Sequence, residues 1–140
     1  MPLTLTVVTM EREVYSADDV ERVIVPASEG VMGILPRHEP ILSALKEGEL
    51  EIVRPGKRDI LAISGGFIEV RGLQVIVMAD MAEQSDEIDV ARAERARAEA
   101  LEALAKAPAQ AERLDMVHAL RRAETRIKVA RRHRGDSVRM

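Results

Sequence analysis

Aromatic residues are nearly missing from this 140-residue chain, since Tyr15 and Phe67 account for the whole 1%. Proteins that bind single-stranded nucleic acids use aromatic side chains as stacking platforms, so this mode of recognition is excluded. Cysteine is absent, which excludes disulfides, thiolate metal sites and thiol nucleophiles. A core must therefore be built from Val, Ile, Leu, Met and Ala, which supply most of the 46% of apolar residues.

Long apolar runs are missing too. A helix needs about 20 mostly apolar residues to cross a bilayer, and no stretch of the chain approaches that length. Residues 1–10 contain no basic region ahead of an apolar run, so we expect no secretory signal peptide there. Any membrane role is therefore expected to be peripheral.

The net charge of −3 hides an asymmetry along the chain. Residues 1–86 hold 15 Asp and Glu against 8 Lys and Arg, whereas residues 87–140 hold 9 against 13. Such a split predicts two modules with different partners. The length is that of one ordinary domain, or of a small domain with an appendage.

The acidic part has the pattern of short β-strands. Its apolar segments are rich in β-branched residues or alternate with polar ones, as in half-buried strands. Turn residues separate them, including residues 55–56, 65–66 and 71–72. The predicted strands are residues 3–8, 23–25, 49–53, 59–63, 67–70 and 73–78. With no helical period between them, they favour an all-β sandwich or barrel.

The pattern changes after residue 86. From there to residue 133 there is no glycine and one proline, Pro108, and alanine is abundant. Ser85 or Asp86 is predicted to cap the first helix, and Pro108 to mark the corner of an antiparallel helical hairpin. We expect domains at 1–86 and 87–134 and a flexible tail at 135–140. Two apolar seams are predicted, formed by Val90, Ala93, Leu101 and Leu104, with Arg97 interrupting their register, and by Met116, Leu120, Ala123, Ile127 and Ala130.

No catalytic or metal site is evident in the sequence. His38, His118 and His133 lie far apart along the chain and form no close ligand pair. The Ser64-Gly65-Gly66 segment lacks the following Lys and Ser/Thr of a P-loop, so a tight turn between strands is the expected structure. We therefore expect no enzymatic activity and no required cofactor.

Three motifs together resemble the epsilon subunit of bacterial F-type ATP synthases, and the similarity covers nearly the whole chain. The motifs are residues 28–40 (SEGVMGILPRHEP), 64–70 (SGGFIEV) and 88–93 (IDVARA). Each is weak alone, because glycine turns and alanine helices are common. Their order and spacing within 140 residues make the resemblance strong.

The resemblance implies an α+β protein, with an antiparallel β-sandwich of about ten strands followed by a two-helix hairpin. It implies a non-catalytic rotor subunit in the central stalk, at the cytoplasmic face of the cell membrane. The expected partners are the gamma subunit, the ring of c subunits and, when the hairpin extends, the alpha/beta catalytic head. Extension of the hairpin would block ATP hydrolysis.

Residues 30–40 are predicted to form a stiff loop, because Pro36 and Pro40 limit its backbone. By resemblance this loop meets the c ring through Val31, Met32, Leu35 and His38. Val31 occupies a position that can be acidic in the family, so contact there would be apolar. An ordinary connecting loop is the alternative.

The resemblance also implies that ATP, as a regulatory ligand, binds the folded hairpin. The matching positions are Glu83, Asp89, Arg92, Arg122 and Arg126. Arginine suits phosphate because its planar fork binds two oxygens at once. Glu99 stands where nucleotide-binding relatives have an arginine, and its carboxylate would repel phosphates. The alternative is that these arginines bind no ligand and only form solvated, charged faces on the helices.

Two rival functions use the same features. The segment after Leu120 holds 8 Lys and Arg against 2 acidic residues and could bind nucleic acid through phosphates, but the acidic, aromatic-poor first module argues against this. A free-standing adaptor with a basic hairpin is the stronger rival. Identifying the partners that the chain binds would distinguish either rival from a stalk subunit.

Overall fold

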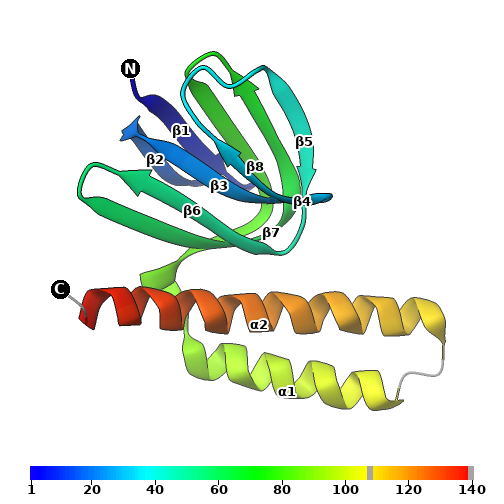
Figure 1. The fold of residues 1–140 in the computed structure, drawn as a ribbon. Coiled ribbons are helices and arrows are strands. Elements are labelled where there is room, and N and C mark those ends of the chain that lie inside the picture. The colour runs from blue at the N-terminus through cyan, green and yellow to red at the C-terminus, as the bar shows by residue number, and fades with distance from the viewer. Residues whose placement is uncertain (107–108, 139–140) are drawn as a thin grey trace.

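The computed structural model describes residues 1–106 and 109–138, with side chains as far as Arg132. Eight strands form a sandwich, and a two-helix hairpin lies along one side of it (Figure 1). This confirms the predicted α+β architecture of a β-sandwich followed by a helical hairpin. None of the described helices is long and apolar enough to span a membrane.

The eight strands belong to one continuous sheet that folds over on itself. Its main path runs β2-β1-β8-β7-β5-β3-β4, and β6 pairs with both β3 and β7. The described pairs are antiparallel, as predicted, except for β1 with β8, which is parallel. The strands are β1 (Leu3–Val8), β2 (Glu13–Val20), β3 (Arg22–Ala27), β4 (Gly30–Ile34), β5 (Ile41–Leu45), β6 (Gly48–Arg54), β7 (Lys57–Arg71) and β8 (Gln74–Gln84).

The strand count is lower than the predicted ten because two strands are long. β7 has 15 residues and β8 has 11, so segments 59–63 and 67–70, predicted as separate strands, are one. The glycines between them do not form a turn. The loop predicted at residues 30–40 is also partly wrong, because residues 30–34 form β4, which pairs with β3 as a hairpin.

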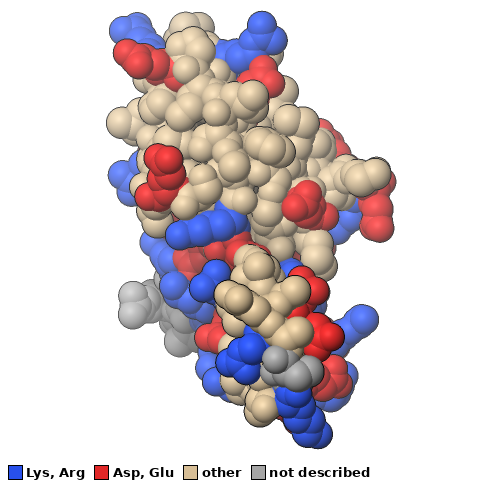
Figure 2. All heavy atoms as spheres, turned by 90° about the vertical axis from the view of Figure 1, so that its right-hand side faces the viewer, with Lys and Arg blue, Asp and Glu red and all other residues tan. Residues whose placement is uncertain are grey.

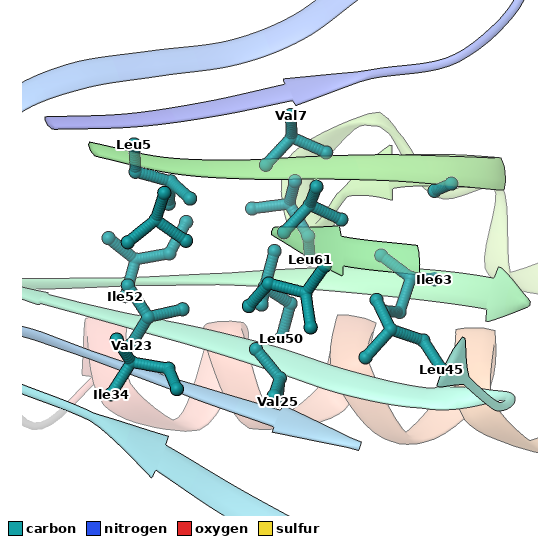
Figure 3. Close-up of a cluster of buried hydrophobic side chains, with 14 of the residues drawn as sticks. Leu5, Val7, Val23, Val25, Ile34, Leu45, Leu50, Ile52, Leu61 and Ile63 are labelled. Atoms are coloured by element: carbon teal, nitrogen blue, oxygen red, sulfur yellow. The ribbon is translucent and has the colours of Figure 1, made fainter. Parts of the chain in front are cut away.

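The main core lies between the two layers and is aliphatic, as the composition requires. Alternate residues point inward, which is the period-two pattern of a sheet with one buried face. Figure 3 shows the side chains from both layers meeting in this space. Its members include Leu5, Val7, Val23, Val25, Ile34, Leu45, Leu50, Ile52, Leu61 and Ile63.

β7 changes layers at Gly65 and Gly66. Residues 57–63 pair with β6, whereas residues 66–70 pair with β5. The inward side changes as well: Leu61 and Ile63 point into the core before the glycines, and Ile68 and Val70 after them. Both glycines have positive φ, 69° and 112°, a region that side chains with a Cβ rarely adopt. The pair therefore lets one strand serve both layers.

The hairpin begins after a short 3-10 turn, η1 (Ser85–Glu87), and consists of α1 (Val90–Lys106) and α2 (Gln110–Val138). The predicted cap is wrong: the Asp89 carboxylate accepts a hydrogen bond from the Arg92 N–H at 3.1 Å, so Asp89 caps α1. Helix α2 continues through Gly135 to Val138, beyond the predicted end at 134, because one glycine weakens a helix without necessarily ending it. The predicted corner at Pro108 lies outside the described residues.

The seam between the helices is built mainly from small residues. Ala93 and Ala100 of α1 are buried, and so are Ala123 and Ile127 of α2. Leu101 is 42% exposed, so the α1 seam is turned by about one residue from the predicted one. Alanine favours this register because its small side chain lets helix backbones approach closely.

Helix α2 lies against the sandwich, and α1 packs on the far side of α2 (Figure 1). A second, smaller apolar cluster joins α2 to β7 and to the segment after η1. Its buried members are Ile60, Ala62, Ile88, Val129 and Ala130. Since alanine buries little area, at about 25 cal/mol per Å² this contact contributes far less than the main core.

A polar network ties β2 to β6 and β7. The Tyr15 hydroxyl donates to Asp59 at 2.5 Å, and Arg54 binds both carboxylate oxygens of Asp19 at 2.7 and 3.2 Å. Burial, reinforced by the hydrogen bond to Asp59, raises the pKa of Tyr15 well above its usual range. The hydrogen bond from Arg54 lowers the pKa of Asp19. These contacts link strands that no described ladder pairs directly.

We expect Gly66→Ala to destabilise the sandwich by at least about 2 kcal/mol, the scale of backbone strain combined with steric overlap. A Cβ at Gly66 would overlap the Met78 carbonyl oxygen and lie 2.8 Å from the Ala79 Cα. Urea unfolding measures the loss. Gly33→Ala is the matched control, because nothing lies within 4 Å of a Cβ there; equal stability of the two variants would contradict this account of the bend.

Candidate functional site

Two of the four predicted c-ring residues form a small exposed tip. Val31 on β4 is 76% exposed and Leu35, just after β4, is 57% exposed. Met32 instead packs against the main core. His38 is half-buried, and its Nδ1 lies 2.8 Å from the Glu39 carbonyl oxygen within the same loop. The side chains of Val31 and Leu35 therefore point outward, whereas Met32 packs on the core and His38 contacts its own loop.

A larger apolar surface lies on the outer side of β1, β8, β7 and β5. The strand register places Met78 beside Phe67, and places Val8 beside Met78. In the next row Ile76 lies beside Glu69, which is opposite Leu42. Phe67 is 52% exposed and Leu42 is 67% exposed. We call Val8, Leu42, Phe67, Ile76 and Met78 the outer apolar face.

The sequence analysis missed the outer apolar face, although a signal was present. Residues 73–78 are apolar at nearly every position instead of alternating with polar ones. Val75 and Val77 point into the core, and Ile76 and Met78 point outward. A strand with apolar residues on both sides predicts burial of both faces, so this surface is incomplete without a partner.

Three of the five predicted nucleotide residues meet beneath the hairpin. Glu83 of β8 faces Arg126 of α2, with Nε–Oε1 at 2.7 Å and a hydrogen bond from Nη2 to Oε2 at 3.2 Å. Arg122, one turn earlier on α2, joins them around a void of about 20 Å³. That void is too small for a nucleotide, and Glu83 already neutralises Arg126.

A larger groove adjoins this cluster and runs between the two helices. It has a volume of about 360 Å³ and is lined by Arg122, Arg126, Glu99, Met81 and several alanines. This volume falls in the range of small-molecule pockets. Arg122 on its wall favours an anionic ligand, whereas Arg126 is already paired with Glu83 and Glu99 opposes an anion.

Asp89 and Arg92 lie apart from this cluster. The Asp89 carboxylate caps α1, and Arg92 is exposed. Arg92 shares a helical stripe with Ala96 and Glu99, which line the groove, and it lies one turn before Ala96. The structure therefore brings Glu83, Arg122 and Arg126 together and leaves Arg92 exposed, outside the lining of the groove.

The histidines do not gather into a site. His38 contacts its own loop, and His118 pairs with Glu47 at 2.9 Å. The His133 side chain lies outside the described part of the chain. Among the residues that the structure describes, no group of three or more His, Cys, Asp or Glu is placed to hold a metal ion.

Comparison with known families assigns both modules. Residues 2–85 match the family described as "ATP synthase, Delta/Epsilon chain, beta-sandwich domain", and residues 86–131 match "ATP synthase, Delta/Epsilon chain, long alpha-helix domain". The chain belongs to the ATP synthase delta/epsilon chain family. It is thus a subunit of an ATP synthase, the complex that couples proton transport to ATP synthesis, as the three motifs predicted.

Curated bacterial relatives match most of this delta/epsilon chain. An ATP synthase epsilon chain of Herpetosiphon aurantiacus is 46% identical over 134 residues, covering 96% of this chain and 98% of the relative. The epsilon chain of Chloroflexus aggregans is 52% identical over 100 residues, 71% of each protein. These bacterial relatives are each similar in both sequence and length.

Solved structures agree with the fold. A chain of the Euglena gracilis mitochondrial ATP synthase, in a structure described as "OSCP/F1/c-ring in rotational state 1", matches with a TM-score of 0.78 at 29% identity. The match covers 89% of this chain and 78% of that one. A chain from the Tetrahymena thermophila mitochondrial ATP synthase, at 17% identity and a TM-score of 0.54, supports the fold alone.

Proposed function

We propose that this delta/epsilon chain is a non-catalytic subunit of the central stalk, held at the cytoplasmic face of the membrane through the complex. Its sandwich docks on the gamma subunit and the c ring, and its hairpin restrains ATP hydrolysis by the catalytic head. The observation that carries the proposal is the outer apolar face, an exposed aliphatic and aromatic surface on a sandwich whose core is already complete. The Euglena relative is described with F1 and a c ring, which supports a position between the two.

Gamma is the partner proposed for the outer apolar face. Phe67, the single phenylalanine of the chain, lies near its centre beside Met78, and buried aromatic residues at the centre of an interface often carry much of its binding energy. The Val31–Leu35 tip lies on a different hairpin, formed by β3 and β4. We assign this tip to the c ring, so that one sandwich bridges both partners.

We expect Phe67→Asp to weaken binding to gamma by at least about 30-fold, the effect of losing a hot spot of about 2 kcal/mol. A carboxylate there would have to be desolvated at the interface. Co-purification with gamma, followed by titration of the purified subunits, measures the loss.

Met10→Asp is the matched control, because Met10 is fully exposed in the turn after β1. If Phe67→Asp binds gamma as the unchanged chain does, the face is wrongly assigned. If neither gamma nor c subunits are retained by the unchanged chain, the free-standing adaptor is the better account.

The hairpin is suited to leave the sandwich as a unit. Its apolar contact with the sandwich is the small cluster around Ile60 and Val129, separate from the main core. Detachment therefore exposes little apolar surface and leaves the sandwich core intact. Helix α2 also carries many arginines, which suit binding to acidic surfaces of the catalytic head. We propose that the detached hairpin extends along gamma and blocks hydrolysis.

Deleting residues 87–140 should leave ATP synthesis largely intact and raise ATP hydrolysis by the isolated head severalfold. The reason is that the deletion removes the blocking element but keeps both docking surfaces. Steady-state hydrolysis by heads assembled with the full or the shortened chain measures the effect. Equal rates at low and high nucleotide concentrations would remove inhibition from the function.

We further propose that ATP is a regulatory ligand of the folded hairpin. The groove between α1 and α2, with Arg122 and Arg126 on its wall, supports this proposal. A ligand that needs both helices in place binds the folded hairpin more tightly than the extended one and shifts the equilibrium toward it. Millimolar ATP could then act even through weak binding, since stabilisation grows with the ratio of ligand concentration to Kd.

Calorimetric titration of the isolated chain with ATP should show saturable heat that Arg122→Ala abolishes. Glu99→Gln should tighten binding severalfold, because it removes a carboxylate that repels the phosphates. Arg121→Ala is the control, since Arg121 lines a different groove on α2. Heat that is unaffected by Arg122→Ala would place the nucleotide elsewhere, and absence of heat even in Glu99→Gln would remove ATP as a ligand.

A further inference from the structure

The surface beneath α2 has a regular pattern of charge. Glu49 and Glu51 of β6 point away from the main core, while the alternating residues Leu50 and Ile52 point into it. The register pairs Glu49 with Ala62 of β7, and Ala62 with Glu83 of β8. The surface thus has an apolar centre on β7, with carboxylates on both sides.

We call this surface the acidic trough. It consists of Ile60 and Ala62 at the centre, Glu47, Glu49 and Glu51 on the β6 side, and Glu83 on the β8 side. In the view of Figure 2, the sandwich surface is mostly neutral, whereas charged residues of both signs gather over the hairpin and where it meets the sandwich.

The residues of helix α2 that face the acidic trough complement it, with apolar side chains on its centre and basic ones beside its carboxylates. Val129 and Ala130 pack on Ile60 and Ala62 in the second apolar cluster. On the β8 side Arg126 binds Glu83 at 2.7 Å.

On the β6 side Arg132 binds Glu49 and lies 3.8 Å from Glu51, and Lys128 lies 3.6 Å from Glu49. Nearer the start of the helix, His118 pairs with Glu47 at 2.9 Å. Cations thus flank the apolar strip of the helix on both sides.

The carboxylates on the β6 side are largely covered. The side chains of Glu47 and Glu49 are 14% exposed, and that of Glu51 is 15% exposed. Removing a carboxylate from water costs free energy unless a cation lies beside it. Loss of one partner therefore penalises the docked helix more than loss of a fully exposed ion pair would.

We propose that the acidic trough is a docking surface for a basic amphipathic helix and that its carboxylates set how often α2 leaves the sandwich. Resting on the proposed inhibitory function, the inference adds a competition: the trough and the catalytic head draw on the same cations of α2. Nucleotide binding in the helix groove acts on the β8 side, through Arg122 and Arg126. Glu49 acts independently on the β6 side.

The test uses the full chain, into which two cysteines can be placed without background because it has none. Spin labels at Ser16→Cys on β2 and Ala98→Cys on α1, both exposed positions, report the docked hairpin as one distance in pulsed EPR. Glu49→Gln should lower the ratio of docked to undocked hairpin about tenfold, the scale of a hydrogen bond to a charged group. Glu21→Gln, an exposed carboxylate at the end of β2, is the matched control and should leave the ratio unchanged.

Salt gives a second measurement that needs no substitution in the trough. Raising the ionic strength from about 0.1 to 1 M shortens the Debye length from about 10 to 3 Å, and the docked population of the labelled chain should fall. In a double-mutant cycle, Glu49→Gln and Arg132→Gln together should cost less than the sum of the two single changes, because each of them removes the Glu49–Arg132 interaction. The proposed role of the trough would be overturned if neither salt nor Glu49→Gln lowered the docked population. It would also be overturned if the effects of the two substitutions were strictly additive.

A hydrolysis assay separates this inference from the proposed function. In the assembled head, Glu49→Gln should lower ATP hydrolysis further, because a released α2 is extended more often. If Glu49→Gln lowers the docked population but not hydrolysis, the docking role of the trough is supported and the inhibitory role of the hairpin is contradicted. If the docked population does not fall, the trough fails whatever hydrolysis does.

Discussion

The bend at Gly65 and Gly66 is the constraint on which the other features of the sandwich depend. It moves β7 from β6 to β5 and reverses which residues of β7 and β8 face the core. Before the bend the outward residues are Ile60 and Ala62, which meet α2. After it they include Phe67, which is exposed. One strand thereby supplies a floor for the hairpin and a surface for another partner.

The two modules differ in how strongly they are held. The main core contains many large aliphatic side chains from both layers (Figure 3), whereas the hairpin meets the sandwich through two isoleucines, one valine and two alanines. Burial energy scales with apolar area, so the sandwich does not depend on the hairpin for its stability. This difference allows a conformational change in one module without unfolding of the other.

Ion pairs supplement the small apolar contact between the sandwich and α2. The acidic excess up to residue 86 and the basic excess after it meet in part at this interface, where Glu49 and Glu83 pair with Arg132, Lys128 and Arg126 of α2. Ion pairs of this kind confer orientation and salt dependence more than raw stability. They suit an interface that must form reversibly and exchange partners.

The sequence alone was sufficient for the family, for the division into a β module and a helical hairpin, and for the α2 seam at Ala123 and Ile127, whereas Ala130, predicted for the same seam, packs on the sandwich. These depend on motifs and on periodicities that extend over a few residues, so local chemistry determines them. It also pointed to Glu83, Arg122 and Arg126, although only through resemblance.

Tertiary structure decided the rest. The sequence analysis took Gly65-Gly66 for a turn, because a glycine pair is equally compatible with a turn and with a bend inside a long strand. It missed the outer apolar face and the acidic trough, since each arises when strands far apart in sequence align in register. Glu49 and Arg132 are separated by 83 positions, and no local pattern shows that they meet. Strand pairing and helix docking are selected by the packing of the whole chain, so only the folded structure reveals which charges and which apolar residues share a surface.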